Sequence, residues 1–272
     1  MKIIDTHTHF FTDDRSPADK EYLKSEGLIL EGNDGELEGL KKFMREDGVS
    51  VSVNAPIALS HQACLKVNRM MIEFNNTQKD VICLGTMHPS MEREAFEEAR
   101  FLAENGIKGV KMHPQIQDFY PDDNSMKDIY EACQKNGLYM VQHAGAGAEP
   151  EFDRDKIKGT PERFRDVIET YPGLKLVIAH MGGLNMWEDA MKYLCGKNVL
   201  FDTAYCTVIK DALLTEIVKA HGADKVMFGS DFPWVRARDI KAKLISCIKD
   251  DRERELVFWG NAAALLGIKP VA

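Results

Sequence analysis

The sequence predicts an α/β protein in which eight parallel strands and eight helices form a closed (β/α)8 or TIM barrel. Two observations favour this fold class: short apolar runs alternate with segments of helical spacing, and eight such pairs fill a chain of 272 residues, a common length for one barrel. No G-x-G-x-x-G motif opens a helix after a strand, so an open dinucleotide-binding sheet has no support. We therefore expect residues 1–272 to form a single domain.

Eight short runs rich in β-branched and apolar residues are the predicted strands. They are residues 2–6, 49–54, 81–86, 109–112, 138–142, 175–179, 199–203 and 225–229. The segments between them have helical spacing, at residues 36–47, 61–79, 91–105, 126–136, 161–171, 185–195, 208–221 and 237–248. Asn-Gly pairs at 105–106 and 136–137 are typical helix ends, because glycine readily takes the left-handed conformation found there. Strands that alternate with such helices are typical of parallel β-α units.

Two segments lie outside this alternation. Residues 10–35 are a long connection after the first strand, and long loops at the strand-exit face of a barrel commonly cover a site. Residues 252–268 follow the last unit and include the large apolar side chains Leu256, Val257, Trp259, Leu265 and Leu266. We expect this second segment to be a C-terminal helix that closes the barrel.

The composition excludes several classes of protein. The chain has 35 Lys and Arg against 43 Asp and Glu, a net charge of −8, and 44% hydrophobic residues. Nucleic acid and anionic membranes are bound through positive surfaces, so we expect neither as a partner; a small-molecule substrate is favoured, and a homo-oligomer stays open. The sequence has no signal-peptide pattern and no apolar run of about 20 residues, which favours a cytoplasmic location. Its six cysteines form no C-x-x-C pair and are typical of buried, reduced thiols.

Six of the eight histidines lie within a few positions of a predicted strand end. They are His7, His9, His88, His113, His143 and His180. The other two, His61 and His221, are expected at solvent-facing helix ends. Catalytic groups of β/α barrels sit at the carboxyl ends of the strands, and imidazole is the commonest metal ligand among side chains. The distribution of histidine therefore indicates a metal-dependent site at the mouth of the barrel.

The sharpest local signal is the pair His7 and His9. Residues two apart in a strand point to the same face, so both imidazoles can bind one ion, and Asp5 could orient them. Three further polar residues follow later strands: His143, His180 and Asp231. Each alone has an ordinary explanation, as a core histidine or a helix-capping aspartate. The coincidence of all of them is better explained by metal binding.

These residues carry a resemblance to a known family. D-x-H-x-H on the first strand, histidine on the fifth, H-x-G-G on the sixth and G-S-D-F-P on the eighth resemble the metal-dependent amidohydrolase superfamily. The pattern, with GNAAALLG at 260–267, looks most like the branch that holds aminocarboxymuconate-semialdehyde decarboxylase and related enzymes. The resemblance covers the whole chain. It implies one divalent metal, usually zinc, held by His7, His9, His143 and Asp231, with His180 unligated or weakly bound.

The chemistry of these residue types agrees with that implication. Three imidazoles and a carboxylate suit zinc, with Mn²⁺ as a further option, and a water on the ion would have its pKa lowered from about 15.7 toward 7. His180 would be the general acid or base, and Asp231 could share the proton. We therefore predict a hydrolase that cleaves a C–N or C–O bond of a small polar substrate, which could bear a carboxylate. The alternatives are a lyase, either a decarboxylase or a hydratase, and a binding protein without catalysis, against which the full ligand set argues.

The fourth strand leaves the number of metals open. In the binuclear branch of the superfamily a carbamylated lysine there bridges two metals, and Lys111 with His143 and His180 could match this arrangement. We favour one metal, because the motifs on the sixth and eighth strands resemble the mononuclear branch. Lys111 or His113 would then bind a substrate carboxylate, and His88 is a further candidate for the pocket.

Overall fold

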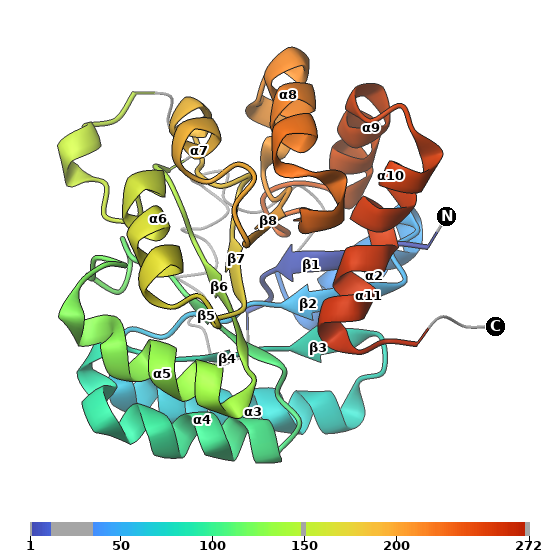
Figure 1. The fold of residues 1–272 in the computed structure, drawn as a ribbon. Helices are drawn as coiled ribbons and strands as arrows, with labels where there is room; N and C mark the ends of the chain where they lie inside the picture. Colours follow the sequence, from blue (N-terminus) through green and yellow to red (C-terminus); the bar gives the residue numbers. More distant parts are fainter. Residues whose placement is uncertain (1, 12–34, 148–150, 270–272) are drawn as a thin grey trace.

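The computed structural model describes residues 2–11, 35–147 and 151–269, in which parallel strands form a central barrel surrounded by helices (Figure 1). The strands are β1 (Ile4–Thr8), β2 (Val51–Asn54), β3 (Val81–Cys83), β4 (Gly85–Thr86), β5 (Gly109–Met112), β6 (Tyr139–Gln142), β7 (Leu176–Ile178), β8 (Leu200–Asp202) and β9 (Val226–Met227). Only Leu84 separates β3 from β4, and these two make the third predicted strand. All eight predicted strands are therefore confirmed, with ends that differ by no more than about two residues.

Hydrogen bonds between the last and the first strand regions close the barrel. The backbone N–H of Thr6 donates to the carbonyl of Phe228 at 2.8 Å, and Thr8 forms a parallel bridge with Phe232. The remaining strands pair in sequence order, each parallel to the next. The predicted (β/α)8 barrel is thus confirmed, and the carboxyl ends of its strands meet at one mouth.

Helices follow the strands, as predicted. They are α2 (Leu37–Asp47), α3 (His61–Thr77), α4 (Ala95–Glu104), α5 (Lys127–Asn136), α6 (Pro161–Thr170), α7 (Trp187–Tyr193), α8 (Asp211–His221), α9 (Ala237–Cys247), α10 (Asp251–Glu255) and α11 (Asn261–Leu266), with short turns η1 (Pro89–Glu94), η2 (Asn124–Met126), η3 (Arg154–Lys156), η4 (Cys206–Val208), η5 (Ala223–Lys225) and η6 (Leu256–Gly260). Ser60 begins α3 by accepting the N–H of Ala63. Gly137, with φ 69°, ends α5, as the Asn-Gly signal predicts.

The C-terminal segment closes the barrel as predicted. It is one nearly continuous helical stretch of α10, η6 and α11, with a π-helical turn at η6. Apolar residues of α11, among them Ala262 and Leu266, belong to one buried group with Ile4 of β1 and Met227 of β9. A larger group of buried side chains fills the layer between the strands and the outer helices.

One histidine prediction is wrong. His221 is only 2% exposed, although we expect it at a solvent-facing helix end. Its ring stacks on Phe201 with 3.8 Å between the ring centroids, and its Nε2 donates to the carbonyl of Val199 at 2.9 Å. The end of α8 is therefore packed against the start of β8, and a histidine at a helix end is buried there.

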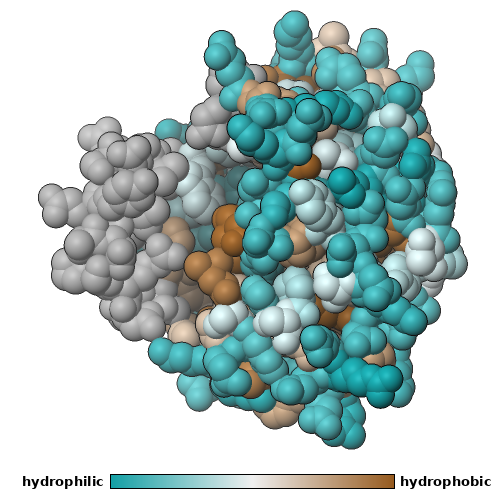
Figure 2. Space-filling model, turned by 90° about the vertical axis from the view of Figure 1, so that its left-hand side faces the viewer, coloured by the Kyte–Doolittle hydropathy of each residue, from teal (hydrophilic) through white to brown (hydrophobic). Residues whose placement is uncertain are grey.

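Most of the predicted connection at 10–35 lies outside the described residues, so its proposed covering role stays a prediction. The face of the molecule in Figure 2 is largely hydrophilic, with a few hydrophobic side chains gathered beside the atoms drawn in grey. Among the described residues, no helix is both long and apolar enough to cross a bilayer.

Candidate metal centre

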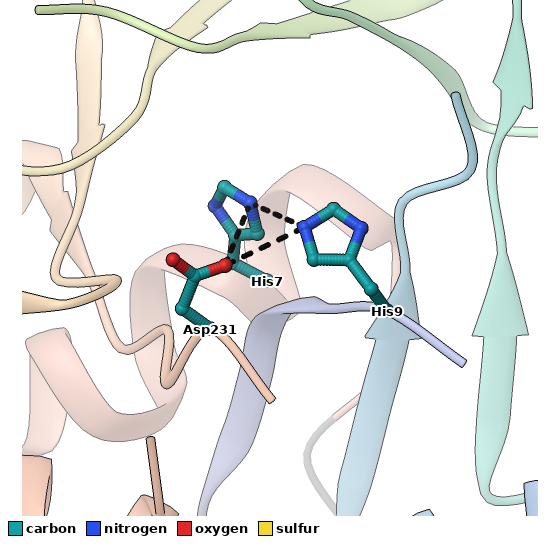
Figure 3. A group of neighbouring side chains, drawn as sticks. All are labelled: His7, His9 and Asp231. Atoms are coloured by element: carbon teal, nitrogen blue, oxygen red, sulfur yellow. Dashed lines mark hydrogen bonds and ion pairs between the residues drawn. The ribbon is translucent and has the colours of Figure 1, made fainter. Parts of the chain in front are cut away.

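Three potential metal ligands converge where the first and last strands meet. His7 lies in β1, His9 directly follows it, and Asp231 lies four residues beyond β9. The Nε2 atoms of His7 and His9 are 3.1 Å apart, and Oδ1 of Asp231 is 3.6 Å and 3.5 Å from them (Figure 3). We call these three residues the ligand trio.

The ligand trio fits a divalent metal ion. Ligand atoms about 2.1 Å from a shared ion, at tetrahedral to octahedral angles, lie about 3.0–3.4 Å from one another. The three distances in the trio, from 3.1 to 3.6 Å, are close to this range. Two imidazoles and a carboxylate are also the donor types that zinc and manganese accept in proteins.

Burial and neighbouring side chains together keep the ligand trio in its metal-binding protonation states. Desolvation lowers the pKa of His7 to about 4 and lowers the pKa of His9, so both rings are neutral at pH 7. Burial alone would raise the pKa of Asp231, but the hydrogen bond with His9 and the nearby rings of His7 and His180 hold it below its usual range. Neutral imidazoles and an ionised carboxylate are the forms that bind metals.

Lys111 of β5 reaches the same centre. Its side chain is almost completely buried, and its Nζ lies 3.0 Å from Nε2 of His7. Burial lowers its pKa to about 8, while the carboxylates of Asp202 and Asp231 oppose this shift. A buried amine of this kind holds positive charge beside the ligand trio at neutral pH.

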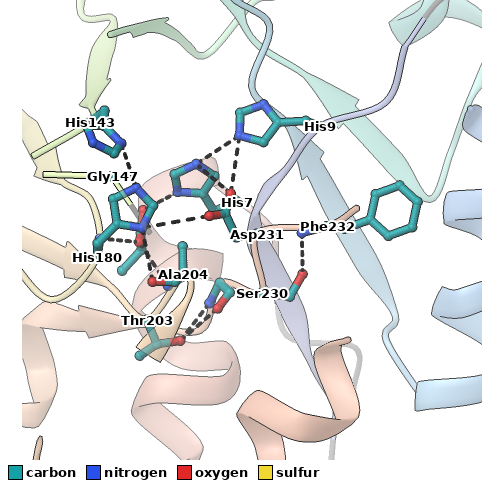
Figure 4. Close-up of polar contacts among 12 residues, drawn as sticks. His7, His9, His143, Gly147, His180, Thr203, Ala204, Ser230, Asp231 and Phe232 are labelled. Atoms are coloured by element: carbon teal, nitrogen blue, oxygen red, sulfur yellow. Dashed lines mark hydrogen bonds and ion pairs between the residues drawn. The ribbon is translucent and has the colours of Figure 1, made fainter. Parts of the chain in front are cut away.

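His143 and His180 form a second pair beside the ligand trio. Nδ1 of His143 lies 2.9 Å from Nε2 of His180, and Nε2 of His143 lies 3.1 Å from the carbonyl oxygen of Ala146. Nδ1 of His180 is 3.0 Å from the carbonyl of Ala204 and 3.9 Å from Oδ2 of Asp231. Figure 4 shows His180 next to His7 and Asp231, with His143 on the side away from His9. The structure thus groups only three of the four predicted ligands, and a ligand role for His143 stays a prediction.

A match to a family model shows which protein family the chain belongs to. The model of the amidohydrolase family matches residues 4–268, which is almost the entire chain. The chain belongs to the amidohydrolase family. The resemblance that the strand-end motifs indicate is therefore confirmed.

A curated relative of this amidohydrolase-family chain is a decarboxylase. This relative is 2-amino-3-carboxymuconate-6-semialdehyde decarboxylase from Dictyostelium discoideum, and the two sequences are 25% identical over 224 residues. The alignment covers 71% of this chain and 62% of the relative. The chain thus spans about 62% of the length of the curated relative that it matches.

Two solved structures resemble the barrel of this family member. The 5-carboxyvanillate decarboxylase from Sphingomonas paucimobilis has a TM-score of 0.74 and 17% identity, over 98% of this chain and 99% of the other. The dihydroxybenzoic acid decarboxylase from Polaromonas, solved with manganese and the inhibitor 2-nitroresorcinol, has a TM-score of 0.74 and 16% identity, over 99% and 98%. At this identity the likeness shows the shared fold.

The other predicted site residues of this amidohydrolase-family chain take two positions. His113 follows β5, and its ring stacks on that of His143 with 3.9 Å between the centroids. His88 instead caps η1, where its Nδ1 accepts the backbone N–H of Ser90 at 3.2 Å. His113 therefore lies beside the centre, and the contacts of His88 are those of a turn-capping residue.

Two carboxylates stabilise this amidohydrolase-family centre, Asp5 and Asp202, and the sequence predicts only Asp5. Asp5 accepts the backbone N–H groups of His7 and Ser230, so it holds the backbone and not the imidazole rings that we expect it to orient. Asp202, which ends β8, contacts the ring of His7, with 2.8 Å between Oδ2 and Nδ1. Its position at a strand end is the signal that could have identified it, by the same rule that selects the histidines.

An apolar cavity of about 350 Å³ opens beside the ligand trio of this family member. It is lined by His9 and by side chains such as Phe10, Met71, Ile116 and Trp234. Trp234 packs edge-on against His9, with 5.2 Å between the ring centroids. His9 therefore belongs both to the metal centre and to the wall of the cavity.

Proposed function

We propose that the chain is a metal-dependent decarboxylase that removes CO2 from a small carboxylate with an apolar body. The observation that carries this proposal is the apolar cavity that shares His9 with the ligand trio. The curated relative and the two solved structures described above are decarboxylases, which supports the lyase alternative better than the hydrolase that we favour from the sequence. The whole-chain family match supports an enzyme of this scaffold.

The geometry suits such a substrate. Lys111 holds positive charge at one end of the site, where a metal ion held by the ligand trio would add to it, and the cavity beyond His9 is apolar. An engineered cavity of about 150 Å³ can bind benzene, so about 350 Å³ is sufficient for one substituted ring. A carboxylate at the trio would place the attached carbon skeleton against Trp234 and Ile116.

Residues of the centre can be assigned to the steps of decarboxylation. When bound, a divalent ion supplies positive charge that holds substrate oxygens and stabilises developing negative charge. Lys111 pairs with the substrate carboxylate through a charge-assisted hydrogen bond. As the C–C bond breaks, its electron pair stays on the carbon atom of the substrate and CO2 leaves. That carbon atom must then receive a proton. We assign delivery of this proton to His180, with Asp231 beside it, and water restores the proton.

The metal in this proposal is one divalent ion. Zinc is the ion that the sequence favours, while the Polaromonas decarboxylase was solved with manganese. Both ions are therefore tested, and His143 is kept as a fourth ligand to be tested with them. Metal quantification separates this arrangement from the alternative in which carbamylated Lys111 bridges two ions: one ion per chain supports the first, and two per chain support the second.

Product analysis tests the proposed reaction. The protein, loaded with Mn²⁺ or Zn²⁺, is incubated with 2,6-dihydroxybenzoate, 5-carboxyvanillate and the corresponding amides, and CO2 and ammonia are measured in ¹⁸O water. We expect CO2 from the acids and no ammonia from the amides. Ammonia with incorporation of ¹⁸O would instead establish the hydrolase.

Paired variants test the assignment of the proton donor. His180→Asn is expected to lower CO2 release by about 100-fold or more, because general acid catalysis contributes about 10²–10⁴ in rate, with metal content unchanged. His88→Asn is the matched control, since asparagine also caps a helical turn, and it should retain activity. Equal loss in both variants, or loss of the metal in His180→Asn, would contradict the assignment.

A further inference from the structure

Asp202 contacts several different elements at the centre. Its side chain is completely buried at the end of β8. Oδ2 lies 2.8 Å from Nδ1 of His7, and Oδ1 accepts the backbone N–H groups of His180 at 2.9 Å and Ala204 at 3.1 Å. Its backbone carbonyl also accepts the N–H of Met181 at 2.7 Å. Asp202 thus contacts residues at the ends of β1, β7 and β8, which are the first, sixth and seventh strands of the barrel.

The contact with His7 determines which ring nitrogen carries the hydrogen. An ionised carboxylate only accepts hydrogen bonds, so Nδ1 of His7 must donate to Asp202. In the neutral ring the lone pair is then on Nε2, the atom that faces His9 and Asp231. We propose that Asp202 is a positioning residue that fixes His7 in the tautomer able to bind a metal through Nε2.

The contacts with the sixth strand extend this role to the backbone. His180 and Met181 both have left-handed backbone conformations, with φ of 59° and 56°, which non-glycine residues rarely adopt. Asp202 accepts the N–H of each, through its side chain and its carbonyl respectively. The same residue therefore holds the turn that directs His180 toward the centre and orients the ring of His7.

Asp202→Asn separates the tautomer from the backbone contacts. The amide oxygen must stay at the position of Oδ1, because the reverse orientation would set the NH2 group against the N–H groups of His180 and Ala204. The NH2 group then faces Nδ1 of His7 and donates to it. This contact favours hydrogen on Nε2 of His7, where it blocks the metal and replaces the lone pair that faces Nζ of Lys111 at 3.0 Å.

The inference rests on the metal site of the proposed function but not on its reaction, and two readouts test it. Long-range ¹H–¹⁵N NMR of metal-free protein labelled at histidine, with His7 assigned by His7→Gln, reports the tautomer. Mn²⁺ titration reports affinity. We expect Nδ1–H in the wild type, Nε2–H in Asp202→Asn and an affinity for Mn²⁺ lowered by about 10–100-fold in the variant.

Thr203→Val is the matched control for a loss of buried hydrogen bonds. Oγ1 of Thr203 bonds to Gly229 at the same strand end, without contact to His7. This variant should lose stability but keep the Nδ1–H tautomer and the affinity for Mn²⁺. Equal losses of affinity in both variants would assign Asp202 a purely structural role and overturn the proposal.

The tautomer decides the proposal even if Asp202→Asn does not fold. Nε2–H in wild-type His7 would overturn it, as would an Asp202→Asn protein that binds Mn²⁺ as tightly as the wild type. Nδ1–H in a wild-type protein that binds neither Mn²⁺ nor Zn²⁺ would support the role of Asp202 in fixing the tautomer. That result would refute only the metal site of the proposed function, so the two failures are distinguishable.

Discussion

Binding of Mn²⁺ to the metal-free protein is expected to change little between pH 7.5 and pH 5.5. The neutral fraction of an ordinary imidazole, with a pKa of about 6.5, falls about 10-fold over this interval, so two such ligands would lower the affinity about 100-fold. Burial instead lowers the pKa of His7 to about 4 and lowers that of His9. A lowered pKa keeps the neutral form present until the pH approaches the lowered value. We therefore expect the affinity for Mn²⁺ to fall by less than about 10-fold between pH 7.5 and pH 5.5.

The assay is equilibrium dialysis or the electron paramagnetic resonance signal of free Mn²⁺ at pH 7.5, 6.5 and 5.5. Lys111→Met is measured in parallel, because Lys111 contacts His7 and its pKa is lowered to about 8. A steep rise of affinity with pH in the wild type alone would depart from the expected small change and would assign it to loss of the Lys111 proton on metal binding, not to the histidines. A 100-fold loss at pH 5.5 in both proteins would refute the argument that burial protects the ligands.

Three further substitutions, one of them with a matched control, test the fold and the cavity. Burial lowers the pKa of His221 to about 4, so this histidine is protonated in the unfolded chain at a higher pH than in the folded one. The free energy of unfolding therefore falls as the pH drops from about 6.5 to 4. His221→Gln should remove about 3 kcal/mol of that fall, measured by urea unfolding. Gly145 has φ 85°, and an added Cβ would lie 2.2 Å from the backbone nitrogen of Leu184, so Gly145→Ala should lower the free energy of unfolding by at least about 3 kcal/mol. Gly48 has φ 74° with open space around it, so Gly48→Ala should lower it by only about 1 kcal/mol. Equal costs would contradict the role of that close contact. Trp234→Ala enlarges the cavity and should raise KM about 10-fold with a smaller change in kcat; an unchanged KM would remove this residue from the substrate site.

The barrel could be predicted because its elements follow local rules. Strands buried on both faces are apolar runs, such as β7 (Leu176–Ile178), which lies within the predicted strand at 175–179. The first strand was predicted at 2–6 but spans Ile4–Thr8. Its last three residues are polar: His7 belongs to the centre, while the hydroxyls of Thr6 and Thr8 donate to the carbonyls of Phe228 and Val53 in neighbouring strand regions. A functional strand end therefore looks like a loop in the sequence.

The site could be predicted only in part. Parallel strands bring their carboxyl ends to one mouth, which is why His7, His9 and Asp231 could be grouped without a structure. Ring orientation depends on local backbone that the sequence does not reveal, such as the left-handed conformation of His180. The sequence alone does not identify Asp202, because an aspartate at a strand end is usually a helix cap or a solvated residue.

A crystal structure of the protein grown with Mn²⁺, with anomalous diffraction at the manganese edge, tests the central claim most directly. We predict one anomalous peak, bound by Nε2 of His7, Nε2 of His9 and a carboxylate oxygen of Asp231, with the apolar cavity open beside it. A peak bound by other residues, or no peak within reach of these three atoms, would contradict the claim. Two peaks bridged by Lys111 would contradict the single-ion site.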